Sequence, residues 1–237
     1  SKASTPVQPI LPYQRKHCSV PQTSGATMKL NLGAGLRMLE GWVNVDKFAN
    51  PGIDKTVDLF RFPWDFPDNS CEEFYLGHIV EHIPHEIKKA AFPNPVAFTT
   101  KDGLTYEWWE NRWKELENLD GWFAFFAEVW RIGKPDAVVK IVAPFGYSHS
   151  AFQDPTHTRY LVPQSFAYLT QEIKENKCFD YHLPLLFETV DFNLEIPMDW
   201  HGIPPEGQVW AISHMWDIAQ NMIATLRVVK ECSATEY

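Results

Sequence analysis

Short apolar runs alternate with amphipathic and turn-rich segments from residue 28 onward, and this pattern predicts an α/β domain. The runs that predict strands lie at 29–32, 42–46, 55–59, 73–76 and 137–143. About one helical turn is predicted at 36–40, and a helix is predicted to begin at 79–83. A longer helix is predicted at 122–132, where large apolar residues recur at helical spacing. Two later segments, 187–196 and 224–230, alternate apolar and polar residues, which predicts an antiparallel pair of strands at an edge of the sheet.

Two stretches fall outside this alternation. Residues 1–27 are rich in Ser, Thr, Pro and Gln without periodicity, so we expect an extended arm or leader. Residues from about 84 to 121 are turn-rich and contain several tryptophans, which predicts an insertion or lid. The remaining chain, 28–237, is expected to form a single domain that carries this insertion.

Composition narrows the function classes. Thirty acidic and 21 basic residues give a net charge of −9, which argues against sequence-independent coating of DNA or RNA. No apolar run approaches the roughly 20 residues of a membrane span. The amino end shows no secretory signal, and the four cysteines form no Cys-x-x-Cys pair. These features predict reduced thiols, a cytoplasmic location and no membrane partner.

The segment 29–35, Lys-Leu-Asn-Leu-Gly-Ala-Gly, reads as a buried strand that ends in a tight turn. Such a turn, at the carboxyl end of a strand, is where nucleotide-like ligands bind in open α/β sheets. A dinucleotide fingerprint would have a third glycine where Met38 stands, and no Gly-Lys-Ser/Thr motif is present, so NAD, FAD and ATP are disfavoured. Asp46 and the pair Asp58-Leu59 end the next two strands, which favours an adenosine ligand without phosphates.

Five sequence pieces carry a family resemblance, and they occur at 30–35, 41–46, 66–70, 78–83 and 128–135. In this order and spacing the chain resembles the class I S-adenosylmethionine-dependent methyltransferases. The resemblance implies a Rossmann-like α/β fold, with a mostly parallel seven-stranded sheet, helices on both faces and an antiparallel C-terminal strand pair. It also implies S-adenosylmethionine as cofactor and S-adenosylhomocysteine as product.

The same resemblance assigns cofactor-binding residues by position. Gly33, Ala34 and Gly35 would line the methionine part and the ribose. Asp46 would hold the ribose hydroxyls, with a role as a mere helix cap as the lesser alternative. The remaining positions are Asp58 and Leu59 at the adenine, Gly77 or His78 beneath the sulfonium, and Asn31, which stands where the family usually has an acid.

Side chains that could bind a metal or take part in catalysis follow the fourth predicted strand. His78, Glu81 and His82 fall at i, i+3 and i+4, so on a helix they would share one face and could chelate a metal. His157, after the fifth strand, should open on the same edge of the sheet and could join them. This layout resembles the metal-assisted branch of the family, but with His78 in place of a glutamate, which favours Zn, Mn or Fe over magnesium.

Several interpretations remain open from sequence alone. Glu81, His82 and His157 are the candidate catalytic residues, with His157 as a base or acceptor-binding residue. The pattern His78-x-x-Glu81-His82 also matches an inverted zinc-peptidase motif. A methyltransferase-like binding module without turnover is a third reading. A small-molecule acceptor, such as a sugar or metabolite hydroxyl or amine, is expected ahead of RNA ends or protein. DNA is disfavoured as an acceptor because the motifs characteristic of DNA methyltransferases are missing from the sequence. The oligomeric state is left open.

Overall fold

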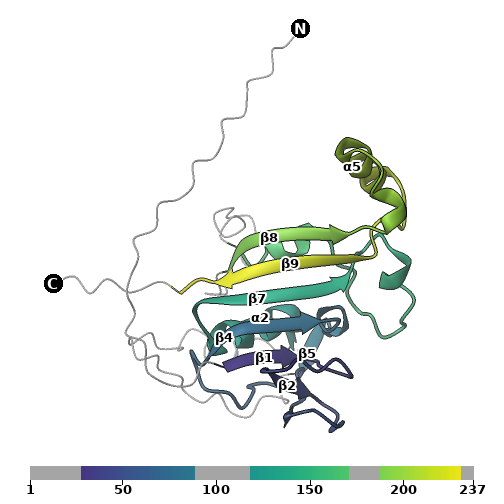
Figure 1. Ribbon diagram of the computed structural model, residues 1–237. Coiled ribbons are helices and arrows are strands. Elements are labelled where there is room, and N and C mark those ends of the chain that lie inside the picture. The colour runs from purple at the N-terminus through teal and green to yellow at the C-terminus, as the bar shows by residue number, and fades with distance from the viewer. Residues whose placement is uncertain (1–27, 89–117, 171–186, 231–237) are drawn as a thin grey trace, which may run out of the picture. The chain divides into compact units, whose positions relative to one another are not determined.

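The computed structural model describes residues 28–88, 118–170 and 187–230, and these described residues belong to one compact unit around a seven-stranded sheet (Figure 1). The strands run in the order β3-β2-β1-β4-β7-β9-β8. Their bounds are β1 Met28–Leu32, β2 Val43–Asp46, β3 Lys55–Thr56, β4 Cys71–Gly77, β7 Gly133–Pro144, β8 Phe187–Glu195 and β9 Asn221–Val228. Each strand that the sequence pattern predicts is present, although β3 is shorter than expected.

The direction of the strands confirms the predicted fold class. β1 pairs in parallel with both β2 and β4, and β4 pairs in parallel with β7. β9 runs antiparallel to β7 and to β8, which gives the expected antiparallel pair at the carboxyl end of the chain. The chain leaves β1 in one direction through β2 and β3 and then returns to β4 on the other side. Ligands in open α/β sheets bind at such a reversal of strand order, outside the carboxyl ends of the strands.

A second, two-stranded sheet holds the ends of the expected insertion. β5 (Glu86–Lys88) pairs antiparallel with β6 (Asn118–Asp120), so the chain enters and leaves the insertion side by side. Most of the insertion, and the predicted arm at 1–27, lie outside the described residues. The other elements are η1 Val80–His82, α2 Gly121–Ile132, η3 His149–Ala151, α3 Pro163–Ala167, η4 Met198–Trp200 and α5 Pro205–His214.

Helix α2, which the sequence predicts almost to the residue, packs its apolar side into the core. Asp120 caps its start by accepting a hydrogen bond from the Trp122 N–H at 2.8 Å. The Trp122 and Phe126 rings lie 5.4 and 6.5 Å from the Phe166 ring of α3, and Phe126 also contacts Phe187 of β8. α2 and α3 are therefore joined to each other and to the edge of the sheet by aromatic contacts.

The chain between β1 and β2 differs from the expectation, because the single helical turn predicted at Leu36–Glu40 is replaced by turns and irregular chain. Strand side chains hold the backbone here instead of helical hydrogen bonds. The Arg37 carbonyl accepts from Asn31 Nδ2 at 2.8 Å, and the Leu39 N–H donates to Asn44 Oδ1 at 2.9 Å. Because these groups are bonded across the strands, a helix does not form at this point.

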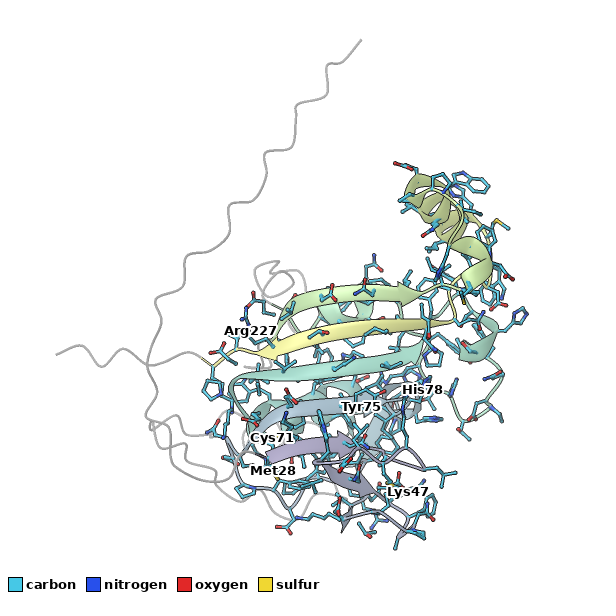
Figure 2. The ribbon with its side chains drawn as sticks, in the orientation of Figure 1. Met28, Lys47, Cys71, Tyr75, His78 and Arg227 are labelled. Carbon is cyan, nitrogen blue, oxygen red and sulfur yellow. The ribbon has the colours of Figure 1, made fainter. Side chains whose placement is uncertain are left out.

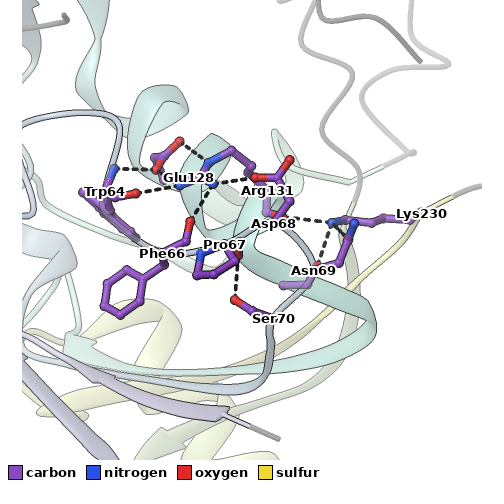
Figure 3. A network of polar contacts seen from close by, with 10 residues as sticks. Trp64, Phe66, Pro67, Asp68, Asn69, Ser70, Glu128, Arg131 and Lys230 are labelled. Carbon is purple, nitrogen blue, oxygen red and sulfur yellow. Dashed lines mark hydrogen bonds and ion pairs between the residues drawn. The ribbon is translucent and has the colours of Figure 1, made fainter. Parts of the chain in front are cut away.

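A buried ion pair fixes the long connection between β3 and β4 (Figure 3). Arg131 of α2 donates to both carboxylate oxygens of Glu128, at 2.8 and 2.7 Å. It also donates to the Trp64 and Phe66 carbonyls and to Asp68 Oδ1 at 2.6 Å. Burial disfavours the guanidinium charge, but the hydrogen bond and charge of Glu128 outweigh it, and the pKa of Arg131 is raised.

The one described cysteine is a core residue. Cys71 is fully buried at the start of β4 and free of disulfide bonds. Burial raises the pKa of its thiol to about 12, so the reactive thiolate is scarce at neutral pH. Among the helices of the described residues, none is long and apolar enough to span a membrane.

Candidate active site

The predicted site residues gather at one edge of the main sheet. Gly33 and Gly35 follow β1, Asp46 ends β2, and His78 follows β4. In Figure 2, His78 and Lys47 lie at the edge where these strands end, and Met28 and Cys71 lie at the opposite edge. This carboxyl edge at the β1–β4 reversal is where the sheet topology places a ligand.

The glycine turn is held tightly on its sheet side and open on its outer side. Gly33 and Ala34 both donate to the Val45 carbonyl, at 2.9 and 3.0 Å. Gly33 has φ +73°, and a Cβ there would lie 2.9 Å from Ile79 Cβ. Gly35 has φ +55°, and a Cβ there would meet nothing within 4 Å. Gly33 is therefore required for packing, whereas the backbone at Gly35 faces open space.

Asp46 links this turn to the end of β2. Its Oδ2 accepts a hydrogen bond from the Gly35 N–H at 2.9 Å, and its Oδ1 accepts from the Phe48 N–H at 3.0 Å. Each carboxylate oxygen has two acceptor sites, so both oxygens keep capacity for a further donor. The carboxylate is thus positioned by backbone on two sides. Phe48, whose side chain is largely exposed beside it, was not picked out by the sequence reasoning.

Asn31 is buried at the end of β1, before the glycine turn, and its side-chain amide donates two hydrogen bonds within the protein. Its Nδ2 bonds the Arg37 carbonyl at 2.8 Å and Asn44 Oδ1 at 2.9 Å. A carboxylate at this position would have no hydrogen to donate to either oxygen, so an amide is the group that fits these two acceptors. Its predicted contact with a cofactor stays a prediction.

The candidate adenine residues lie in the turn after β3. Asp58 is exposed, and its carboxylate accepts from the Phe60 N–H at 3.1 Å and pairs with Arg61 at 3.3 Å. Leu59 is buried, and its carbonyl accepts from Trp64 Nε1 at 3.3 Å. These contacts shape the turn, and the assignment of both residues to adenine binding stays a prediction.

The chain bends sharply after β4. A Cβ on Gly77 would lie 2.6 Å from the Tyr75 ring, so this position accepts only glycine without rearrangement. His78 has φ +57°, and its N–H donates to the Val142 carbonyl of β7 at 2.8 Å. The side chain of His78 therefore leaves the sheet at its carboxyl edge, beside the glycine turn whose Gly33 packs on Ile79.

The helix predicted from Ile79 to Ile83 is wrong, because η1 is only the short 3-10 turn Val80–His82. Ile83 adopts an extended conformation with ψ 118°, as expected for a residue that precedes a proline. His78 stands before this turn in a left-handed conformation, so the shared helical face does not exist. One contact of the expected group survives, since His78 Nδ1 lies 3.2 Å from Glu81 Oε1.

Glu81, His82 and His157 converge all the same. Their ligand atoms all lie within 4.8 Å of one another, and the two imidazole rings meet edge to face with centroids 4.8 Å apart. Glu81 is 2% exposed, and its Oε2 has no hydrogen-bond partner. His78 is not a member of this group. The topology thus brings the predicted downstream histidine to the residues that follow β4.

A clamp that the sequence reasoning missed holds the two segments together. The backbone N–H groups of Thr158 and Arg159 donate to the Glu81 carbonyl, at 2.9 and 3.0 Å. The Arg159 guanidinium donates to the Ile83 and Pro84 carbonyls, at 2.8 and 2.9 Å. The sequence offered one signal for this clamp, which is that Thr158 and Arg159 directly follow His157. Their hydrogen-bond partners lie about 75 residues earlier in the chain.

Comparisons with known proteins find distant structural similarity. No family model matches the sequence, and a search of curated proteins finds no match. Similar solved structures include a SAM-dependent methyltransferase from Archaeoglobus fulgidus, 15% identical, with TM-score 0.47 and 86% of each chain covered. Another, from Mesorhizobium loti, is 10% identical with TM-score 0.45, covering 86% of this chain and 91% of that one.

The order of the strands, with β9 alone reversed, decides the fold. The chain has the class I methyltransferase fold. A third similar structure is the [4+2]-cyclase SpnF, 13% identical with TM-score 0.43, covering 87% of this chain and 76% of that one. These likenesses are distant, and a fold does not determine a function, so they do not identify the reaction.

Replacing Gly33 by alanine tests the packing beneath the turn. We expect a loss of about 2–4 kcal/mol in the free energy of unfolding, from left-handed strain plus overpacking against Ile79. Gly41→Ala is the matched control, because its φ of +78° carries the strain but its Cβ would meet open space. Urea unfolding measures both variants, and equal losses would contradict the packing argument.

Proposed function

We propose that this protein binds S-adenosylmethionine at the carboxyl edge of its sheet and transfers the methyl group to a hydroxyl or amine of a small-molecule acceptor. The observation that carries the proposal is the Asp46 carboxylate, fixed by the N–H groups of Gly35 and Phe48 at the reversal of strand order. A carboxylate placed there suits the two hydroxyls of a ribose.

The residues around this carboxylate fit an adenosyl ligand. The outer side of the Gly35 backbone is open, which supports a close approach of the ribose and methionine part. Leu36, which follows Gly35, and Phe48, two residues after Asp46, present exposed apolar side chains that would cover an apolar ligand surface. In the proposal Asp58 and Leu59 meet the adenine, Gly77 and His78 close the site beneath the sulfonium, and Asn31 supports the turn from below.

Methyl transfer requires that the acceptor molecule is correctly placed and that a base takes its proton. The sulfonium supplies the methyl group: the acceptor's lone pair forms the new bond to the methyl carbon, and the carbon–sulfur bond breaks with its electrons left on sulfur. His157 is the proposed base. Its Nδ1 lies 2.9 Å from the Ala151 carbonyl, which fixes the hydrogen on that nitrogen and leaves Nε2 able to take the acceptor's proton. Glu81 and His82 line the same space.

Alternatives differ in what they require of these residues. An inverted zinc peptidase would bind zinc through His78 and His82 with Glu81 as base, but His78 pairs with Glu81 and lies outside the cluster. The peptidase interpretation also gives no role to the Asp46 carboxylate that the Gly35 and Phe48 N–H groups hold in place. A binding module without turnover uses the same cofactor residues, so only a measured reaction separates it from an enzyme.

Calorimetry of the purified protein with S-adenosylmethionine and S-adenosylhomocysteine tests the binding step, with NAD and ATP as control ligands. We expect binding of the first two and not of the controls. A screen of sugar, phenol and amine acceptors for release of S-adenosylhomocysteine then tests transfer. Absence of binding would overturn the whole proposal, whereas binding without release for any acceptor would favour the binding module.

A further inference from the structure

We propose that the methyl acceptor carries an aromatic ring, which stacks on a surface of four half-exposed rings at the carboxyl edge of the sheet. This surface is called the aromatic platform, and its members are Tyr147, Phe152, Tyr160 and Trp216. The assignment rests on the proposed function, since it names the substrate class of the same site. His157 keeps its role as the base.

The rings of the platform contact one another and yet remain open to solvent. Phe152 and Tyr160 stack nearly parallel, with ring centroids 4.3 Å apart and an interplanar angle of 14°. The Trp216 ring lies 5.6 Å from that of Phe152 and 6.2 Å from that of Tyr147. Each of the four residues is still 49–53% exposed. Contiguous exposed apolar surface of this kind typically marks a place where a ligand or partner binds.

The platform adjoins the segment that carries the proposed base. Phe152 directly follows Ala151, whose carbonyl accepts the hydrogen of His157 Nδ1 at 2.9 Å. Tyr160 follows His157 on the other side, so the stacked pair brackets the loop in which His157 lies. An acceptor ring bound on this pair is therefore held by the same loop as the base that takes its proton.

A polar link holds Trp216 against the loop that follows β7. The N–H of the next residue, Asp217, donates to the Tyr147 carbonyl at 2.9 Å. The Asp217 carboxylate accepts from the His149 N–H at 2.8 Å and pairs with His149 Nδ1 at 2.6 Å. These contacts maintain Asp217 at φ +66°, a left-handed conformation that is uncommon outside glycine. The platform is thus assembled before a ligand arrives, which reduces the entropy lost on binding.

The polar side chains next to the platform favour an aromatic ligand over a sugar, because they are already occupied. Asp217 Oδ1 also accepts from Gln220 Nε2 at 3.0 Å. Asp154 Oδ1 accepts from the N–H and the hydroxyl of Thr156, at 2.8 and 2.7 Å. A sugar needs such groups to replace the water around its hydroxyls, whereas an aromatic ring mainly needs ring faces and edges.

Charge argues against a nucleic acid as the stacking ligand. Bases also stack on aromatic side chains, but RNA carries phosphates that require positive partners. The platform is flanked by the carboxylates of Asp154 and Asp217, and the whole chain has a net charge of −9. The ligand class that fits is therefore a small uncharged phenol or arylamine, whose hydroxyl or amine the base can deprotonate.

The first test compares two ligands that differ in aromaticity alone. The full-length protein, without added cofactor, is titrated with 2-naphthol and with its saturated analogue decahydro-2-naphthol. Both have the same carbon skeleton and a hydroxyl, so we expect 2-naphthol to bind about 5-fold more tightly or better through ring stacking. Methyl glucoside and a uridine oligonucleotide should bind more weakly than 2-naphthol. Equal affinity for the two naphthols, or tighter binding of the glucoside or the oligonucleotide, would overturn the proposal.

A fluorine label shows where the ring binds. Protein labelled with 5-fluorotryptophan is observed by fluorine NMR, and Trp216→Phe and Trp210→Phe identify two resonances by their loss. Trp210 is the internal control, because it is similarly exposed in the same β8–β9 connection but stacks on His214 at 4.9 Å, outside the platform. We expect 2-naphthol to shift the Trp216 resonance and not that of Trp210. No shift at Trp216, or equal shifts at both, would contradict the platform.

Variants measure what the rings contribute. Trp216→Ala and Phe152→Ala are each expected to lower the affinity for 2-naphthol by about 5-fold or more. Phe152→Leu keeps an apolar side chain without a ring and should lose nearly as much, whereas Phe152→Tyr should bind like the wild type. Trp210→Ala is the matched control and should also bind like the wild type. Unchanged affinity in both alanine variants at the platform would overturn the assignment.

Two further measurements separate failure of the platform from failure of the proposed function. The platform shares no residue with the proposed cofactor site, so each variant should bind S-adenosylhomocysteine like the wild type, which also shows that it is folded. Cofactor binding without a preference for aromatic rings would overturn the platform alone. An aromatic preference without cofactor binding would overturn the proposed function, and with it the assignment of the bound ring as methyl acceptor.

Turnover gives the final readout. Among acceptors that cause release of S-adenosylhomocysteine, phenols and arylamines should be used ahead of sugars and aliphatic amines. Trp216→Ala should raise KM for these acceptors by about 5-fold or more with little change in kcat, because stacking holds the acceptor equally in the ground state and the transition state. A loss confined to kcat, or a preference for sugars, would contradict the proposal.

Discussion

Replacing Asp46 by alanine is expected to lower the affinity for S-adenosylmethionine by at least about 100-fold. Two hydrogen bonds from ribose hydroxyls to an ionised carboxylate contribute about 1.5–3 kcal/mol each, and 1.4 kcal/mol corresponds to about a factor of ten. Isothermal calorimetry with S-adenosylmethionine and S-adenosylhomocysteine measures the change, and both ligands should lose affinity alike because the ribose is common to them.

Two controls accompany this variant. Asp65→Ala removes an exposed acid that pairs with Lys55, and its affinity should match that of the wild type. Asp46→Asn keeps one acceptor oxygen and the side-chain shape, so its loss should be smaller than that of the alanine variant. An Asp46→Ala protein that remains folded and binds within threefold of the wild type would contradict the assignment of Asp46 to the ribose.

Replacing Arg131 by methionine is expected to lower the free energy of unfolding by about 3–5 kcal/mol, because the Glu128 charge would stay buried without its partner. The change also removes the donors to the Trp64 and Phe66 carbonyls, so the connection before β4 loses its attachment to α2. Urea unfolding followed by circular dichroism measures the loss.

The matched control is Lys29→Met, which breaks the half-exposed ion pair between Lys29 and Glu73. Such pairs contribute about 0–1 kcal/mol, so this variant should be nearly as stable as the wild type. The double variant Arg131→Met with Glu128→Gln should recover part of the loss, since it removes the unpaired charge. An Arg131→Met variant whose free energy of unfolding lies within about 1 kcal/mol of that of the wild type would contradict this account, because breaking a buried ion pair should cost more than that.

Local sequence determined where the strands lie and where the backbone needs glycine. Alternation and apolar runs are properties of neighbouring residues, so β1, β4, β7 and the final antiparallel pair were predictable. The left-handed turn at Gly33 and Gly35 was predictable because few other residues adopt it without cost. Asp46, at the end of β2, was predictable because parallel strands deliver their carboxyl ends to one edge of the sheet.

Tertiary structure decided the rest, because the deciding contacts join residues far apart in the chain. The turn after Gly35 is held by Asn31 and Asn44 rather than by a helix, and η1 stops short at Pro84, so spacing by 3.6 residues misplaced His78. Glu81 meets His157 across about 75 residues, through backbone hydrogen bonds that no local pattern encodes. A sequence can nominate side chains for a site, but the pairing of strands and the folding of their connecting loops determine which of them come within reach of one another.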